Sequence, residues 1–126
     1  MHKITVDEGA ALIEVTLDGL INLDESKVAC AALRRALTQL GGRPIKILVD
    51  AQFLQPVSQE VADEFRGVQR YGLVLGLARV AQVVESSVVL LQRSRIMREA
   101  GTGPLTRTFR DREAARRWLL SRGAGT

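Results

Sequence analysis

The polar residues best placed for chemistry follow two short apolar runs in the middle of the chain. Asp50 and Gln52 come at the end of the run 45–49, and Glu85 comes directly after the run 77–84. If both runs are parallel strands, their carboxyl ends meet at the edge where open α/β sheets bind ligands. Two carboxylates there could hold a cation or move a proton. Hydration, capping or pairing with an arginine explains them as well, and this alternative is preferred.

Two serines stand close to these carboxylates, where helices are expected to begin. A helix start presents unpaired N–H groups and a partial positive charge, which together favour an anionic group. We therefore predict a binding site for a ligand or a partner at the carboxyl edge of the sheet, formed by Asp50, Gln52, Ser58, Glu85 and Ser87. N-capping alone explains Ser58, and phosphorylation of Ser58 is the functional alternative.

Several familiar chemistries lack the residues that they need. His2 is the one histidine and Cys30 the one cysteine, so neither a zinc site nor a Ser-His-Asp triad can be assembled. We interpret Cys30 as a structural thiol. The phosphate-loop pattern Gly-x-x-x-x-Gly-Lys is absent, and Gly101-Thr-Gly103 is a lone turn-like pair of glycines. The sequence thus predicts no metal ion, no cofactor and no catalytic residue.

The elements that would position these residues follow from periodicity and capping signals. Alternation before and after Glu8-Gly9 predicts a hairpin, and the stripe of alanines and leucines in 22–40 predicts a helix that Asn22 caps. After the hairpin, strands and helices alternate as β-β-α-β-α-β-α-β-α. This order predicts an α/β fold: one mixed, mainly parallel five-stranded sheet with about four helices. The remaining predictions are strands at 45–49, 77–84 and 105–109, a helix from the cap Ser58 to Gly72, a helix from Ser86 or Ser87 to Ala100, and a helix after the cap Asp111.

The charge of the chain is +4 and unevenly distributed. Residues 87–126 carry nine arginines and three acids, whereas residues 1–86 are net acidic. A basic third could bind nucleic acid or anionic lipid, but the chain has no aromatic stacking platform, so a solvated helix face is preferred and no nucleic-acid partner is expected. The length fits one domain, 1–126, and the apolar runs are too interrupted to span a membrane. With one cysteine and no secretory signal, we expect a cytoplasmic protein.

Three stretches resemble the STAS fold of anti-sigma-factor antagonists. They are VTLDGLINLDESKVACAALRRAL, IKILVDAQFLQPVSQEVADEF and the pattern RVAQVVESS…REAG…TRTFRDREAARRWLL. The last is similar to a bacterial SpoIIAA-like subgroup, in which a strand ending in Phe precedes an acidic cap, alanines and a Trp-Leu pair. Phosphorylated antagonists carry an Asp-Ser-Ser-Gly-like turn before the second helix. This chain has Gln55-Pro56-Val57-Ser58-Gln59 at that place, so only Ser58 could match the phosphorylated serine, and its neighbours differ.

The resemblance implies a non-enzymatic regulatory module that binds a protein partner. The subgroup is also similar to lipid-carrying domains. This likeness implies, as an alternative, a carrier or sensor of a small apolar or lipid ligand. An enzyme whose chemistry leaves no recognisable motif is the third alternative. We also expect Trp118 to be buried, since it shares a predicted helix face with Ala114, Ala115 and Leu119.

The apolar stretch Leu73–Leu77 is longer than a helix end needs, and this predicts a homodimer. Light scattering of the purified protein at high micromolar concentration should give twice the mass of the chain. The mass of one chain at that concentration would disprove the prediction.

Overall fold

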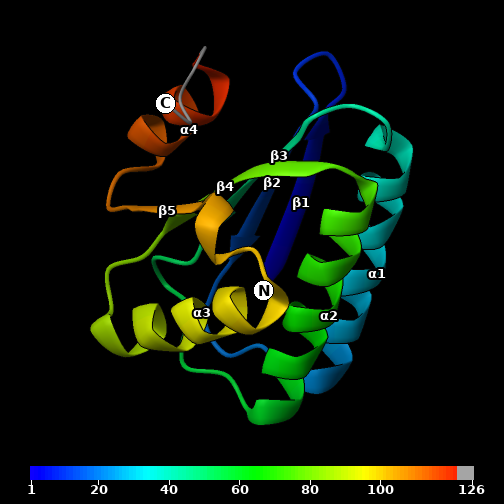
Figure 1. Cartoon of the computed structure of the whole chain (residues 1–126). Helices are drawn as coiled ribbons and strands as arrows, with labels where there is room; N and C mark the ends of the chain where they lie inside the picture. Colours follow the sequence, from blue (N-terminus) through cyan, green and yellow to red (C-terminus); the bar gives the residue numbers. More distant parts are fainter. Residues whose placement is uncertain (122–126) are drawn as a thin grey trace.

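The computed structural model describes residues 1–121, which form a five-stranded sheet with helices on both of its faces (Figure 1). The short 3-10 helix Gly103–Leu105 precedes the last strand. The elements, in chain order, are β1 (His2–Asp7), β2 (Leu12–Leu17), α1 (Leu23–Leu40), β3 (Ile45–Asp50), α2 (Gln59–Leu75), β4 (Leu77–Val83), α3 (Ser87–Ala100), β5 (Thr106–Phe109) and α4 (Arg112–Leu120).

The strands lie side by side in the order β1-β2-β3-β4-β5. The first two form an antiparallel hairpin, and every later pair is parallel. At the hairpin turn, Asp7 accepts a hydrogen bond from the backbone N–H of Ala10 at 3.1 Å, and Ala11 adopts a φ of 51°. The predicted mixed, mainly parallel sheet with four helices is confirmed.

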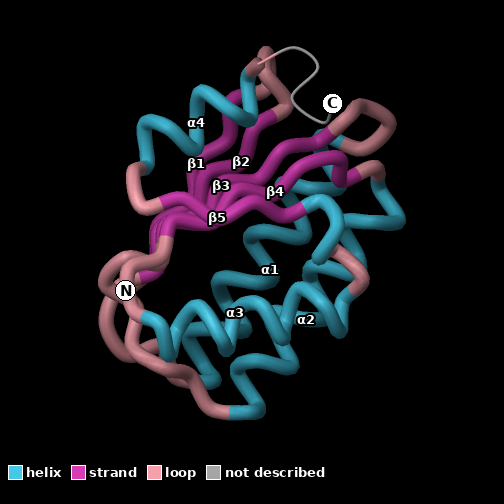
Figure 2. Tube along the Cα trace, turned by 60° about the vertical axis from the view of Figure 1, so that its left-hand side comes forward, coloured by secondary structure: helices cyan, strands magenta, loops and turns pink. Residues whose placement is uncertain are grey.

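Two layers of unequal size cover the sheet. Helices α1, α2 and α3 lie on one face, and α4 lies alone on the other (Figure 2). Alternate residues of β2 separate accordingly: Ile13, Val15 and Leu17 join the large core under the three helices, and Leu12 joins a small core under α4. Because strand residues point alternately to the two faces, the polar Glu14 and Thr16 lie on the α4 side.

The helix caps that the sequence predicted are present. Asn22, Ser58 and Asp111 accept hydrogen bonds from backbone N–H groups in the first turns of α1, α2 and α4. Of the two serines considered for α3, Ser86 is the cap and Ser87 is the first helical residue.

The predicted end of α2 at Gly72 is wrong, because the helix continues to Leu75. Gly76 ends it instead, with a φ of 106°, in the left-handed region that glycine adopts freely. Gly72 serves packing: a Cβ atom there would lie 3.2 Å from the side chain of Leu77.

The long apolar stretch is therefore divided between two elements. Val74 is 82% exposed, whereas Leu77 enters β4 and is buried. The surface available to a second copy at this place is Leu73, Val74 and the partly buried Leu75. The homodimer stays a prediction.

Trp118 is half-buried and packs against the small core, so it is less buried than the sequence predicted. Its ring centroid lies 5.7 Å from that of Phe109, and the guanidinium carbons of Arg79 and Arg107 lie 5.9 and 5.8 Å from its ring. The short α4 packs on the sheet through Ala115 and Leu119, which are fully buried, whereas the indole stays partly exposed. Trp118 still anchors the helix, but at the border of the small core.

Adjacent leucines in α4 allow a test of this packing. Leu119 is buried in the small core and Leu120 is 49% exposed. Leu119→Ala should lower the free energy of unfolding by about 2–5 kcal/mol, because it removes buried methyl groups and leaves a cavity. Leu120→Ala is the control and should change it by less than about 1 kcal/mol. Urea denaturation followed by circular dichroism measures both; equal effects would contradict the position of α4.

Candidate functional site

The carboxyl edge of the sheet is formed where β2, β3 and β4 end and α1, α2 and α3 begin (Figure 1). The three parallel strands share a direction, so their connecting loops collect at this edge. The five predicted site residues lie at the end of β3, in the connections that lead into α2 and α3, and at the first position of α3.

Asp50 and Gln52 are in contact with each other. The backbone N–H and the side-chain Nε2 of Gln52 donate to Oδ1 of Asp50 at 3.2 and 3.1 Å, and Arg112 donates to Oδ2 at 3.1 Å. Asp50 is also 8% exposed. The preferred interpretation from the sequence was hydration, capping or pairing with an arginine, and the last of these describes Asp50. Glu85 is exposed on the loop after β4.

The two serines differ in what they contact. Ser58 is exposed, and its Oγ accepts from the backbone N–H of Val61 at 3.2 Å. Ser87 is exposed in the first turn of α3, and the cap of that helix is Ser86. Gln92 on α3 holds the residue before Ser58: it accepts from the N–H of Val57 at 2.8 Å and donates to its carbonyl at 2.6 Å. The start of α2 is thus fastened to α3.

Exposed apolar side chains at this edge were not among the residues predicted from the sequence. Leu20 and Phe53, on the loops after β2 and β3, are 68% and 71% exposed. The two loops are joined by backbone hydrogen bonds, from Gly19 to the carbonyl of Phe53 at 2.8 Å and from Gln55 to that of Gly19 at 2.9 Å. Val88 and Leu91 of α3 are exposed as well. The available signal was a pair of adjacent large apolar residues in each loop, Leu20-Ile21 and Phe53-Leu54, of which only the second is buried.

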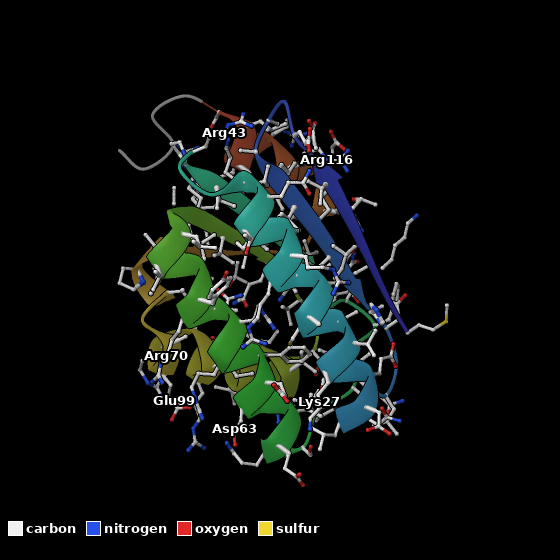
Figure 3. All side chains as sticks on the ribbon, turned by 90° about the vertical axis from the view of Figure 1, so that its right-hand side faces the viewer. Lys27, Arg43, Asp63, Arg70, Glu99 and Arg116 are labelled. Atoms are coloured by element: carbon white, nitrogen blue, oxygen red, sulfur yellow. The ribbon has the colours of Figure 1, made fainter. Side chains whose placement is uncertain are left out.

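A second polar cluster, also missed, lies on the face that α4 only partly covers. Arg112 donates to Glu14 and to Thr16 at 3.0 Å, as well as to Asp50, and Arg116 donates to Glu14 at 2.6 Å. These residues, with Lys3 and Thr5 of β1, line an open hollow of about 370 Å³. Figure 3 shows Arg116 beside the ribbons of β1 and β2.

We call the four charged residues of this cluster, Glu14, Asp50, Arg112 and Arg116, the ion-pair network. Two features of the sequence could have indicated this network. Glu14 and Thr16 are polar residues on one face of a strand, and Arg112 and Arg116 are four residues apart on the last helix. The sequence interpreted these arginines as a solvated helix face. The side chains of Arg112 and Arg116 are 34% and 40% exposed, and they also form ion pairs with the sheet. Their guanidinium groups join α4 to β2 and β3.

The pKa of Glu14 reflects the network. Burial alone raises the pKa of a carboxyl group, but the hydrogen bonds and positive charges of Arg116 and Arg112 outweigh burial and hold the pKa of Glu14 below its ordinary value. The pKa of Arg116 is raised, chiefly by its hydrogen bond to Glu14. The ion pairs help to hold α4 on the sheet.

Cys30 is 1% exposed and belongs to the large core. Burial raises the pKa of its thiol to about 11, so the thiolate that nucleophilic chemistry requires is scarce at neutral pH. Within residues 1–121, no three His, Cys, Asp or Glu side chains come together as a metal site would require. In the same part of the chain, no helix combines the length and the apolar character needed to cross a membrane.

The fold and the site define a class: a mixed-sheet α/β module whose exposed loops and helix starts gather at the carboxyl edge. A model of the SpoIIAA-like family matches residues 12–120, from β2 to the end of α4. The chain belongs to the SpoIIAA-like family. No curated protein matches it significantly. No solved structure does so either.

The lowered pKa of Glu14 predicts how stability changes with pH. Because folding lowers this pKa, its ion pairs stabilise the folded state above the unfolded-state pKa of about 4.3, and this stabilisation is lost as pH falls through the lower folded-state pKa. Glu14→Gln should therefore reduce the free energy of unfolding by about 1 kcal/mol at pH 7, and the difference from the native sequence should shrink below about pH 4.

Urea denaturation at a series of pH values measures this difference. Glu85→Gln is the matched control, because Glu85 is an exposed glutamate, and should change the free energy of unfolding by less than about 0.5 kcal/mol. A Glu14→Gln effect that stays constant from pH 7 to pH 3 would show that the network does not stabilise the fold through charge.

Proposed function

We propose that the protein is a non-enzymatic regulatory module that binds a protein partner through the carboxyl edge of its sheet. Membership of the SpoIIAA-like family supports this proposal, because that family resembles the antagonists that act by contacting other proteins. We also propose that the protein is cytoplasmic, because its one cysteine is a free thiol, as is usual in a reducing compartment.

The observation that carries the proposal is a pair of exposed apolar side chains, Leu20 and Phe53, on two loops that are hydrogen-bonded to each other. Phe53 is 71% and Leu20 is 68% exposed, although each is large enough to contribute to a core. The backbone hydrogen bonds between their loops limit the motion of both. A rigid aromatic anchor with an aliphatic neighbour is typical of the centre of protein interfaces, because little conformational entropy is lost on binding.

The charge around these side chains indicates the chemistry of the partner. Asp24, Glu60 and Glu85 are exposed at or near the starts of α1, α2 and α3. An apolar centre with an acidic rim is complementary to an apolar patch surrounded by lysine and arginine. We therefore infer a basic partner surface, and affinity that decreases as the salt concentration rises.

Ser58 lies within this edge and is the proposed point of regulation. Its hydroxyl is exposed and contributes one capping hydrogen bond. A phosphate on Ser58 would add about −1.5 to −2 charges and could still accept hydrogen bonds from the first turn of α2. The other predicted residues, Asp50, Gln52, Glu85 and Ser87, complete the proposed partner surface.

The test begins with capture of a partner by the purified protein and continues with the affinity of the purified pair. Phe53→Ser and Leu20→Ser should each weaken binding by about tenfold or more, because each removes an apolar anchor. Val74→Ser is the matched control: Val74 is 82% exposed but lies at the opposite end of α2, and binding should be unchanged. If both edge variants bind as tightly as the native protein, the proposed surface is wrong.

Variants of Ser58 test the regulatory part separately. Ser58→Ala should retain the partner, whereas Ser58→Asp should change the affinity, and intact mass spectrometry of protein from native cells should detect one phosphate. If both variants bind like the native protein and no phosphate is found, the switch is excluded and the docking surface remains.

A further inference from the structure

Strand β1 is a free edge of the sheet. It comes first in the strand order, and within residues 1–121 its one paired neighbour is β2. Figure 3 shows β1 as the outermost ribbon of the sheet. Its six residues pair with β2 without a bulge and include no proline. Such an edge can bind another strand, because it presents a row of unpaired N–H and C=O groups.

The backbone groups of β1 that face away from β2 belong to His2, Ile4 and Val6. The amino group of Met1 donates to the carbonyl of Asp18, and the N–H of Asp18 donates to the carbonyl of Met1, both at 2.8 Å. This reciprocal pair continues the register between β1 and β2. Backbone groups alternate in direction along a strand, so the odd-numbered residues point toward β2 and the even-numbered residues point outward.

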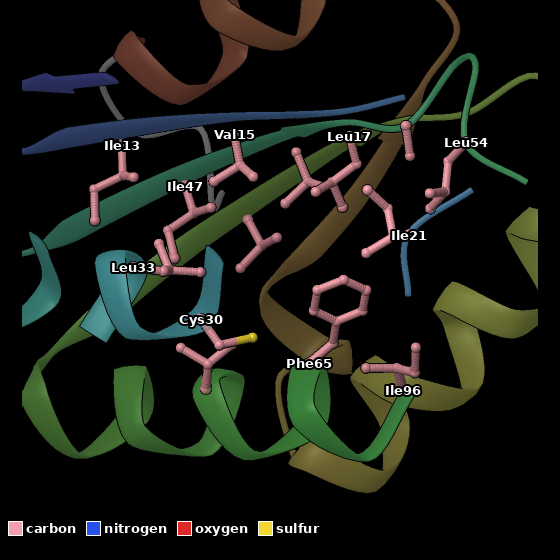
Figure 4. Packing of buried hydrophobic residues seen from close by; sticks show 14 of the residues in the cluster. Ile13, Val15, Leu17, Ile21, Cys30, Leu33, Ile47, Leu54, Phe65 and Ile96 are labelled. Atoms are coloured by element: carbon pink, nitrogen blue, oxygen red, sulfur yellow. The ribbon is translucent and has the colours of Figure 1, made fainter. Parts of the chain in front are cut away.

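The side chains of Ile4 and Val6 lie on the face of the sheet that the three helices cover. They stand opposite Val15 and Ile13 of β2, which point toward the helices in Figure 4. Ile4 packs against the large core, whereas Val6 is 37% exposed. Val6 therefore offers apolar surface at the free edge.

The other face of β1 carries two opposite charges. Lys3 and Asp7 are exposed, and the exposed Thr5 lies midway between them. Turning the strand end for end about Thr5 therefore exchanges the cation for the anion. In an antiparallel strand pair, opposite charges that face each other stabilise and like charges destabilise. The charge pattern of β1 is complementary to itself.

We propose that two copies of the chain pair through β1, antiparallel and centred on Thr5, so that their two sheets become one continuous sheet. Lys3 then lies opposite Asp7 of the second copy, and Ile4 lies opposite Val6 of the second copy. Both contacts occur twice, because the interface has two-fold symmetry. The facing backbone groups of Ile4 and Val6 can exchange hydrogen bonds, as in any antiparallel pair. Centring on Ile4 instead would place Lys3 opposite Thr5 and leave the charges unmatched.

This interface is separate from the two surfaces considered above. Leu20 and Phe53 of the proposed docking surface lie on loops after β2 and β3, outside β1. A chain that does not dimerise could still bind its partner, and the reverse also holds. The homodimer predicted from the stretch Leu73–Leu77 would instead use the end of α2. Variants of the two places distinguish these interfaces.

Sedimentation velocity of the full chain over a dilution series measures the dissociation constant of the dimer. Val6→Pro removes an outward N–H group and should weaken dimerisation by about tenfold or more. The pairing of β1 with β2 should persist, because that N–H group faces away from β2. Val74→Ser is the matched control: Val74 is 82% exposed on α2, and the dimer should be unchanged.

Two charge variants test the register. Lys3→Glu places a negative charge opposite Asp7 of the second copy, and Asp7→Lys places a positive charge opposite Lys3, so each should weaken its own dimer by about tenfold. An equimolar mixture of the two variants should form mixed dimers about as tight as the native dimer, because every cation then faces an anion. Asp7→Lys also removes the hydrogen bond to Ala10 in the turn, so circular dichroism of each variant verifies the fold.

Four results would overturn the proposal. The mass of one chain at high micromolar concentration would show that no second copy occupies this edge, which would leave it to a strand of another protein. Val6→Pro could dimerise as tightly as the native chain. The mixture of charge variants could associate no more tightly than either variant alone. Loss of the dimer in Val74→Ser, with Val6→Pro still dimeric, would place the interface at the end of α2.

Discussion

Parallel pairing of β2, β3, β4 and β5 is the constraint on which the rest of the structure depends. Two parallel neighbours cannot be joined by a tight turn, so each connection must return the chain along a face of the sheet. Three of these connections contain α1, α2 and α3, all on one face. The same constraint places the ends of β2, β3 and β4 at one edge, where Leu20, Phe53 and Ser58 lie on the loops that follow.

The unequal covering of the sheet explains the ion-pair network. The nine residues of α4 pack on β3, β4 and β5, and on this face they leave β1 and most of β2 open. An apolar strand face would be exposed there, and the chain instead has Lys3, Thr5, Glu14 and Thr16. Arg112 and Arg116 then reach from α4 to these polar positions. The small core and the ion pairs together hold a helix that is too short to be stable alone.

Helix α3 contributes to the carboxyl edge and to the core through side chains on different faces. Its exposed Val88 and Leu91 belong to the carboxyl edge, and Gln92 holds the residue that precedes the Ser58 cap. The next residue, Arg93, is buried in the core. Adjacent positions of a helix face different directions, so one short segment contributes to a surface and to the interior at once.

The sequence alone was sufficient for the elements and their order. The stripe of alanines and leucines after Asn22, the caps Ser58 and Asp111, and the turn at Glu8-Gly9 are local patterns, and each element they predict is present because backbone hydrogen bonding acts over a few residues. The carboxyl edge was also predictable, because alternating strands and helices give parallel strands, and parallel strands all end at the same edge of a sheet. The end of α2 was not, because Gly72 packs closely against Leu77 and Gly76 provides the turn.

Tertiary structure alone decided which charged groups meet. Arg112 and Asp50 are 62 residues apart in sequence, and Arg116 and Glu14 are 102 apart, so no local pattern relates them. The position of α4 on the sheet creates these pairs. The burial of Arg93 likewise depends on how closely α3 and α2 pack, and arginine in an amphipathic helix is ordinarily exposed. Periodicity in a sequence reports the direction of a side chain, whereas its partners are set by long-range packing that the local chain does not encode.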